Sequence, residues 1–253
     1  MGKIIAVTNQ KGGVGKTTTS VNLTACLAEI GQNVLAVDLD PQGNTSSGLG
    51  AKPGPKSIYE VMVGKLPMRD CIVKTKVKGL HLAPADIRLA GAEVELVNVP
   101  NREYRLKSAL EQVSGDYDFI FIDCPPSLGL LTVNALAAAG RVLVPIQCEY
   151  YALEGVTSLM NTINRIKRTV NPALDIEGIL LTMLDGRTNL GLQVVDQVKR
   201  HFKNKVFSVT IPRNVRLGEA PSHGLPIHLY DSRSAGAEAY RALAKEVLER
   251  NPR

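Results

Sequence analysis

The chain has 253 residues, 44% of them apolar, and its 30 lysines and arginines exceed its 24 acidic residues by six. This composition excludes an intrinsically disordered chain, because the apolar fraction is ordinary and the charge modest, and the length suits one α/β domain of roughly 250 residues. The positive charge permits nucleic-acid contact without establishing it.

The cysteines and the uncharged stretches exclude further classes. The four cysteines are scattered without a C-x-x-C pair, which predicts neither a zinc site nor a disulfide framework. The longest uncharged stretch, 124–140, contains prolines and polar residues and does not suit a membrane span. No secretory leader precedes the first apolar run. We expect a cytosolic protein.

In chain order, the pattern alternates between short apolar runs and helical periodicity. A strand over 3–8 is followed by a glycine-rich turn, a helix over 17–30 that Gly31 closes, and a strand over 33–38. Residues 50–115 are less regular, with shorter helices. Further strands are expected at 118–123, 141–146 and 176–182, and further helices at about 128–139, 150–170, 190–203 and 234–250.

Apolar runs separated by helices predict strands buried on both faces. We therefore expect an α/β fold with a mostly parallel central sheet and helices on both of its faces. No linker or composition shift divides the chain, so residues 1–253 are predicted to form one domain.

A phosphate-binding loop is indicated between the first strand and the first helix, at Lys11-Gly-Gly-Val-Gly-Lys-Thr17. Glycines let the backbone wrap an anion, and the helix N-terminus adds positive potential there. In such loops the lysine before Thr17 reaches the β- and γ-phosphates, and the threonine hydroxyl is placed for Mg²⁺. The general pattern starts with a glycine where this chain has Gln10, and it lacks the additional Lys11.

This loop resembles the deviant Walker A motif of the ParA/MinD ATPases, and the resemblance extends over essentially the whole chain. It implies a P-loop NTPase that binds ATP and Mg²⁺ and closes into a dimer around two nucleotides. It also implies that Lys11 reaches the partner subunit's nucleotide, that Lys16 is catalytic, and that the loop binds ATP. The implied loop contacts are Lys11, Gly12, Gly13, Val14, Gly15, Lys16, Thr17 and Thr18.

Acidic residues end two of the predicted strands. Asp38 and Asp40 lie two residues apart in extended chain and so point the same way, at the sheet edge where parallel strands present ligands. The resemblance implies that Asp40 positions or activates the attacking water and joins Thr17 in the magnesium site. Asp38 is either structural or helps to organise the magnesium sphere.

Asp123 ends an apolar run and is followed by Cys124-Pro-Pro-Ser127. A buried acid needs a compensating cation, which a water-mediated link to Mg²⁺ supplies in Walker B sites; a buried salt bridge is the alternative. The resemblance implies the magnesium role for Asp123 and places Pro125, Pro126 and Ser127 in the second switch. It also implies that Pro212 and Asn214 contact the adenine.

Basic residues dominate 187–216, where Asp196 is the sole acid. Lysines and arginines without interleaved aromatics suit phosphate contact, although a solvated helix face is the simpler interpretation. The resemblance implies that Arg187 and Arg216 carry non-specific binding of double-stranded DNA. The candidate DNA-binding residues are Arg187, Lys199, Arg200, Arg213 and Arg216.

Within the family the chain is most similar to the chromosomal ParA proteins. The resemblance implies a DNA-partitioning ATPase that is associated with the nucleoid and stimulated by a centromere-binding ParB-type partner. The alternatives are a MinD-like ATPase on a membrane surface and a metal-cluster carrier of the same fold. The last helix mixes acids with bases, which favours docking on the core over a membrane anchor.

Overall fold

The computed structural model describes residues 2–52, 54–149 and 152–252. Its strands are β1 (Lys3–Val7), β2 (Val34–Asp38), β3 (Val73–Lys74), β4 (Leu80–Ala83), β5 (Phe119–Asp123), β6 (Arg141–Gln147) and β7 (Asp175–Thr182). Its α-helices are α1 (Lys16–Glu29), α2 (Asn44–Gly48), α3 (Ile58–Met62), α4 (Met68–Cys71), α5 (Leu89–Glu95), α6 (Arg105–Glu111), α7 (Leu130–Ala138), α8 (Ala152–Thr169), α9 (Asn189–Phe202), α10 (Val215–Glu219), α11 (Ile227–Tyr230) and α12 (Ala235–Arg250). The 3₁₀ turns are η1 (Arg102–Tyr104), η2 (Ser114–Asp116), η3 (Lys203–Lys205) and η4 (Ala220–His223).

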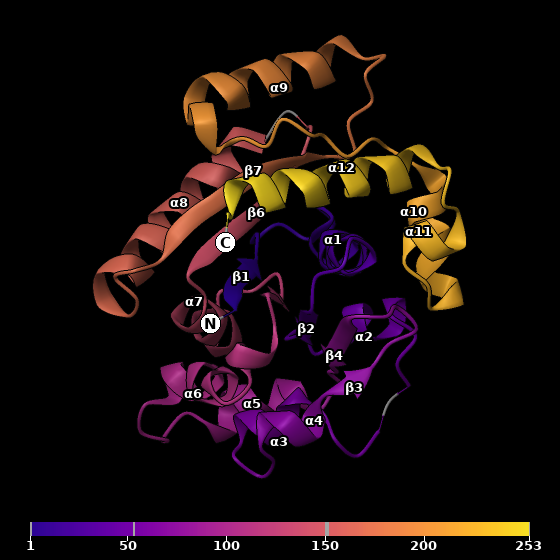
Figure 1. Cartoon of the computed structure of the whole chain (residues 1–253). Coiled ribbons are helices and arrows are strands. Elements are labelled where there is room, and N and C mark those ends of the chain that lie inside the picture. The colour runs from indigo at the N-terminus through magenta and orange to yellow at the C-terminus, as the bar shows by residue number, and fades with distance from the viewer. Residues whose placement is uncertain (1, 53, 150–151, 253) are drawn as a thin grey trace.

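The described strands form one sheet in the order β3-β4-β2-β5-β1-β6-β7 (Figure 1). All neighbours are parallel except β3, which pairs antiparallel with β4. The register places Asp38 beside Asp123 at the ends of β2 and β5. Three loops important for function therefore leave the same edge of the sheet, from β1, β2 and β5.

Alternate residues of the strands face two separate apolar cores. On β5, Phe119 and Phe121 join the core that includes α1 and α12, whereas Ile120 and Ile122 join the core under α3 to α9. Figure 1 shows α12 alongside α1, with α5, α6 and α7 on the other side of the strands. The predicted fold class, a mostly parallel sheet with helices on both faces, is confirmed.

The predicted elements differ from the observed ones by one or two residues at most ends. The irregular region 50–115 contains four short helices, α3 to α6, together with the hairpin of β3 and β4, which the pattern did not indicate. Val73 pairs with Leu82 and Lys74 with His81, and Gly79 adopts a positive φ of 83° in the turn between them. Two strands of two and four residues are too short to give a measurable alternation.

Within the described ranges, none of the helices combines the length and the apolar character needed to cross a bilayer. The last helix docks on the protein interior, as its charge pattern predicts: Tyr240, Leu243 and Val247 of α12 are buried against the core that contains α1.

Candidate functional site

The glycine-rich loop joins β1 to α1 in backbone conformations that favour glycine. Gly13 and Gly15 have φ values of 74° and 88°, and Gly15 is the N-cap residue of α1. The loop is fixed to two neighbouring strands: Asn9 donates its side-chain amide to the Pro145 carbonyl at 2.8 Å, and the Thr182 hydroxyl donates to the Val14 carbonyl at 2.8 Å. The backbone is therefore shaped as an anion cradle before any ligand arrives.

The two lysines of the loop take different directions. Lys16 is 7% exposed, and its Nζ donates to the Lys11 carbonyl at 3.2 Å across the loop. Burial lowers the pKa of the Lys16 ammonium, and the negative charge of Asp123 opposes that shift. Lys11 instead points outward, where its Nζ lies 3.0 Å from Oε2 of Glu149 with both side chains half-exposed. Lys16 belongs to its own loop, and Lys11 is held at the surface.

Asp123 is almost fully buried and accepts three hydroxyl hydrogen bonds. Thr17 and Thr45 donate to Oδ2 at 2.9 and 2.7 Å, and Ser20 donates to Oδ1 at 2.9 Å. Burial raises the pKa of Asp123 to about 6, although the three hydroxyls favour the charged form. No ion pair compensates Asp123 among the described residues, so the geometry does not show the buried salt bridge that was the alternative.

Asp38 fixes the loop that follows β2. Its Oδ2 accepts from the backbone N–H and the hydroxyl of Ser46, both at 2.7 Å, and its Oδ1 accepts from the Asp40 N–H at 3.2 Å. Burial, and then the charge of neighbouring Asp123, raises the pKa of Asp38 to about 7. Both carboxylate oxygens of Asp38 thus accept hydrogen bonds from the loop that follows β2. This favours a structural role for Asp38 over a role in the magnesium sphere.

Asp40 lies at the start of the next turn and is 8% exposed. Its Oδ1 accepts from the Gln42 N–H at 3.0 Å, and its carbonyl accepts from the Gly43 N–H at 2.9 Å. The negative charge of Asp40 acts to raise the pKa of both Lys16 and Asp123. The structure therefore brings these three residues close enough to interact electrostatically.

The donor set fits Mg²⁺ bound together with phosphate groups. Hydroxyl and carboxylate oxygens of Thr17, Asp123 and Asp40 are hard ligands, and Mg²⁺ in phosphate sites takes one or two protein ligands and keeps several waters. In the described part of the chain, no group of three or more acidic, histidine or cysteine side chains forms a metal cage. The residues suit a cation that arrives with nucleotide.

The predicted adenine loop is anchored to the end of β7. The Arg213 N–H donates to the Leu184 carbonyl at 3.1 Å, and the Leu184 N–H donates to the Ile211 carbonyl at 3.0 Å. Thr182, two residues earlier, contacts the phosphate loop. Oδ1 of Asn214 is buried, and none of the described residues donates a hydrogen bond to it. An unpaired buried acceptor suits an exocyclic amine such as that of adenine, which carries the donor this atom lacks.

The candidate DNA-binding residues do not form one uniform surface. Arg187 donates to both carboxylate oxygens of Asp185, at 2.9 and 2.8 Å, which holds the pKa of Asp185 below its usual range. Arg216 pairs with Glu219 at 2.8 Å and with Asp231 at 3.5 Å. The charge count over 187–216 missed these three acids because they lie outside that range.

The remaining basic residues are separated along α9. Lys199 and Arg200 lie in its last turn, whereas Arg187 precedes its first residue, and 14 helical residues span about 20 Å. Arg213 is exposed in the loop before α10 and acts on Asp185 from the Arg187 side. Arg187 and Arg213 therefore lie near the N-terminal end of α9, and Lys199 and Arg200 lie at its C-terminal end.

Several residues of the site were not predicted from the sequence. Ser20 and Thr45 bind Asp123, Thr182 contacts the phosphate loop, and Glu149 pairs with Lys11. Ser20 follows Lys16 by one helical turn, a spacing that could have placed it on the same face. The other three come from distant segments, and no local signal marks them.

Comparison with known proteins identifies the family. A family model described as an AAA domain matches residues 2–176. The sporulation initiation inhibitor protein Soj of Bacillus subtilis is 61% identical over 249 residues, 98% of each chain. The chromosome partitioning protein ParA of Myxococcus xanthus is 54% identical, over 99% of this chain and 89% of its own.

A solved structure gives the same fold. Cobyrinic acid a,c-diamide synthase from Mycobacterium smegmatis, with bound ADP and magnesium, has 42% identity and a TM-score of 0.87, covering 98% of this chain and 95% of that one. With the glycine-rich loop, the buried Asp123 and this sheet order, the conclusion follows: the chain belongs to the Soj/ParA family of chromosome-partitioning ATPases, with a P-loop NTPase fold.

Proposed function

We propose that residues 1–253 act as one ATPase domain that switches between a free and a DNA-bound state. ATP binding with Mg²⁺ closes two copies over their nucleotides, the dimer binds double-stranded DNA without sequence preference, and hydrolysis releases it. The observation that carries this proposal is the division between the two loop lysines. Lys16 is committed to its own loop, whereas Lys11 is at the surface with only a half-exposed partner.

The residues of the site have different roles in hydrolysis. Lys16 and the N–H groups of Gly12 to Thr18 neutralise the phosphates, and Asp40 orients the attacking water and accepts its proton. Lys11 of one subunit adds positive charge at the partner's γ-phosphate, where charge develops in the transition state. Thr17, Asp40 and Asp123 would hold Mg²⁺, which would neutralise negative charge on the bound phosphates.

Base recognition is assigned to the loop after residue 211. The ring of Pro212 offers an apolar platform, and Asn214 Oδ1 accepts a hydrogen bond from the adenine amine. The unpaired state of that oxygen supports the choice of adenine over guanine, whose corresponding group is a carbonyl acceptor.

DNA binding is assigned to Arg187, Arg213 and Arg216 at one end of α9 and to Lys199 and Arg200 at the other. Within one chain, Arg187 and Arg216 form ion pairs with acids, so the net positive charge of this surface in one subunit is smaller than its basic residues suggest. Two subunits side by side double the number of phosphates contacted, which makes strong binding depend on the dimer.

Membership of the family supports an inference about the partner and the location. We infer that a ParB-type centromere-binding protein stimulates hydrolysis and that the protein works in the cytoplasm on the nucleoid, without a membrane partner. A MinD-like role on a membrane is the alternative, and the burial of Tyr240, Leu243 and Val247 argues against it, because α12 uses its apolar face to dock on the core.

The Asp40→Ala variant tests the cycle. It removes the group that activates water and leaves the glycine-rich loop intact, so we expect ATP to bind, turnover to stop, and a dimer to persist. Sedimentation of this variant with ATP and with ADP measures the dimer, and phosphate release measures turnover. Normal turnover would remove Asp40 from the chemistry, and a monomer with ATP bound would contradict the nucleotide-closed dimer.

A further inference from the structure

A second candidate site lies at the other edge of the sheet, where β3 is the outermost strand. A cavity of about 510 Å³ opens there between the chain after α2 and the β3–β4 hairpin. Leu49 and Leu82, both buried in the core that includes α1, contribute to its apolar lining together with Pro84. Val73, 39% exposed, extends this apolar lining to the surface. We call this cavity the β3-edge pocket.

Four of the residues that line the β3-edge pocket are lysines, and none of its described lining residues is acidic. They are Lys52, Lys56, Lys74 and Lys76, and all four are exposed. In the described part of the chain, none of them makes an ion pair, whereas most of the described arginines do. The pocket therefore combines an apolar interior with a concentrated, uncompensated positive charge.

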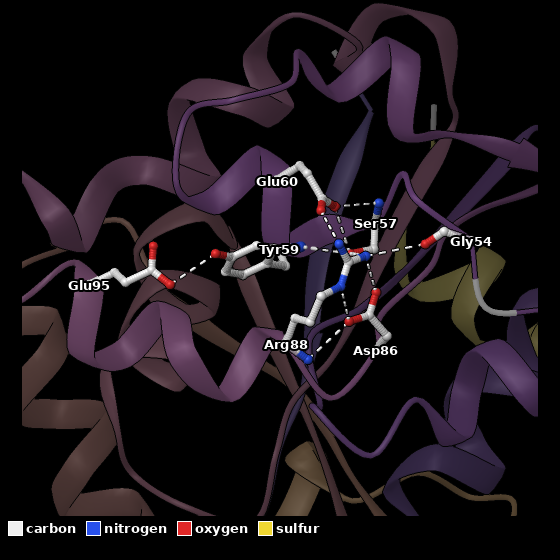
Figure 2. A network of polar contacts seen from close by, with 7 residues as sticks. All are labelled: Gly54, Ser57, Tyr59, Glu60, Asp86, Arg88 and Glu95. Carbon is white, nitrogen blue, oxygen red and sulfur yellow. Dashed lines mark hydrogen bonds and ion pairs between the residues drawn. The ribbon is translucent and has the colours of Figure 1, made fainter.

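Two acids that lie near the pocket lining in sequence, Asp86 and Glu60, are paired with an arginine. Arg88 donates to Asp86 at 2.6 and 2.8 Å and to Glu60 at 2.5 Å (Figure 2). The same guanidinium donates to the Gly54 carbonyl at 3.2 Å, and Gly54 lines the pocket between Lys52 and Lys56. Arg88 thus pairs with two carboxylates that could otherwise pair with the lysines. It also fixes the segment that contains Lys52 and Lys56.

We propose that the β3-edge pocket docks an acidic segment of a protein partner, with one apolar side chain inside the cavity and flanking carboxylates on the four lysines. Charge complementarity selects an anionic partner, because the lysines have no acid of their own. The apolar lining selects a peptide, because a DNA backbone presents phosphates and sugars and would leave the exposed Val73 without an apolar partner. This proposal is independent of the ATP-driven cycle.

The location of the pocket separates it from the proposed DNA surface. β3 and β7 are the opposite ends of the strand order, and α9 follows β7 (Figure 1). A partner at the β3 edge would therefore leave Lys199 and Arg200 accessible. The outer side of β3 pairs with no described strand, which leaves backbone groups available to an extended peptide.

The direct test is fluorescence anisotropy with a labelled synthetic peptide that carries a central leucine between glutamates. The pocket variant replaces Lys56, Lys74 and Lys76 with Gln. Its matched control replaces Lys107, Lys167 and Lys245, three exposed lysines elsewhere, so both variants have the same net charge. We expect about tenfold weaker binding for the pocket variant and wild-type affinity for the control. ATP turnover unchanged in both variants reports an intact fold.

Three further measurements locate the peptide. Replacing its leucine with serine should weaken binding to the wild type, and Val73→Glu should weaken binding of the original peptide. Hydrogen exchange should show protection at 49–52 and 73–76. Equal losses in both lysine variants would reduce the effect to net charge and overturn the proposal. So would a peptide indifferent to its leucine, or ATP-dependent duplex DNA binding that is lost in the pocket variant but kept in its control.

Discussion

At the scale of residues, the site depends on buried polar groups that are satisfied by hydroxyls rather than by counter-ions. Asp123 accepts from Thr17, Ser20 and Thr45, and each of these donors belongs to a different turn or helix position around the phosphate loop. A hydroxyl group is neutral, so it can rotate toward a cation or a phosphate without moving a counter-ion away from Asp123. These hydroxyl donors can therefore reorient when a nucleotide and its cation bind.

Lys16→Ala tests the phosphate-loop assignment. The buried ammonium is expected to contact the phosphates, and charge-assisted hydrogen bonds of this kind are worth a few kcal/mol, so ATP affinity should fall roughly 100-fold. Titration calorimetry of the variant beside Lys107→Ala measures the change. Unaltered affinity in Lys16→Ala would show that the phosphates bind elsewhere.

Glu149→Gln tests whether the Lys11 ion pair opposes dimer formation. Both side chains are half-exposed, so the pair is weak, and its loss should favour the ATP dimer by about two- to fivefold. The measurement is the dimerisation constant in the Asp40→Ala background with ATP, where turnover does not interfere. A weaker dimer would mean that Glu149 contributes to the interface instead of restraining Lys11.

Asp38 gives the stability of the nucleotide-free protein a dependence on pH. Its pKa is about 7 in the folded protein and near 3.8 in the unfolded chain, so the unfolded state releases this proton first. The contribution is fully present below pH 3.8 and is lost as pH rises through about 7. Asp38→Asn lacks this term, and relative to wild type it should gain roughly 3 to 4 kcal/mol between pH 4 and 8.

Urea unfolding of both proteins in EDTA across that range measures the difference. The amide also replaces an oxygen that accepts from Ser46 or Asp40, which adds a constant loss at every pH. The test is how the difference in the free energy of unfolding between the two proteins changes with pH. Parallel curves of unfolding free energy against pH would contradict the assigned pKa.

At the scale of elements, β7 connects the packing of the sheet to the phosphate loop. It ends at Thr182, which contacts that loop, and Gly178 in its middle faces the ring of buried Phe207. A Cβ on residue 178 would overlap this ring, and the Arg250 guanidinium also packs over the ring, 4.2 Å from its centroid. The glycine is therefore required by packing.

Gly178→Ala should lower the free energy of unfolding by roughly 1 to 3 kcal/mol, the usual cost of overpacking a core. Gly115→Ala is the matched control, because a Cβ there meets no atom within 4 Å. The midpoints of urea denaturation compare the two. If both variants unfold at the wild-type midpoint, Phe207 can move aside and the close packing is not needed.

The elements also show what the sequence could and could not predict. Long apolar runs such as β5 and amphipathic helices such as α12 were predicted within one or two residues, because their periodicity is local. The β3–β4 hairpin was missed since its strands are too short for a pattern. Glu149 and Thr45 were missed because only the folding of distant segments brings them to Lys11 and Asp123.

At the scale of the whole molecule, ion pairs reduce the unpaired positive charge of the proposed DNA surface in a single subunit. The sequence predicted five basic residues for that surface, and the fold pairs two of them, Arg187 and Arg216, with acids from outside the basic stretch. Composition could not show this pairing, because it arises from tertiary structure. Fewer unpaired positive charges are therefore present on the proposed DNA surface of one subunit than the five basic residues suggest.

The measurement that tests the central claim is binding of duplex DNA to the purified protein, with ATP and with ADP, across a salt series. Each phosphate contact adds a slope of about −0.9 to the logarithm of affinity against the logarithm of salt concentration. We predict binding that requires ATP, falls steeply with salt, and weakens in Arg216→Ala while turnover stays intact. Binding of equal strength with either nucleotide, or full affinity in Arg216→Ala, would contradict the ATP-gated DNA switch.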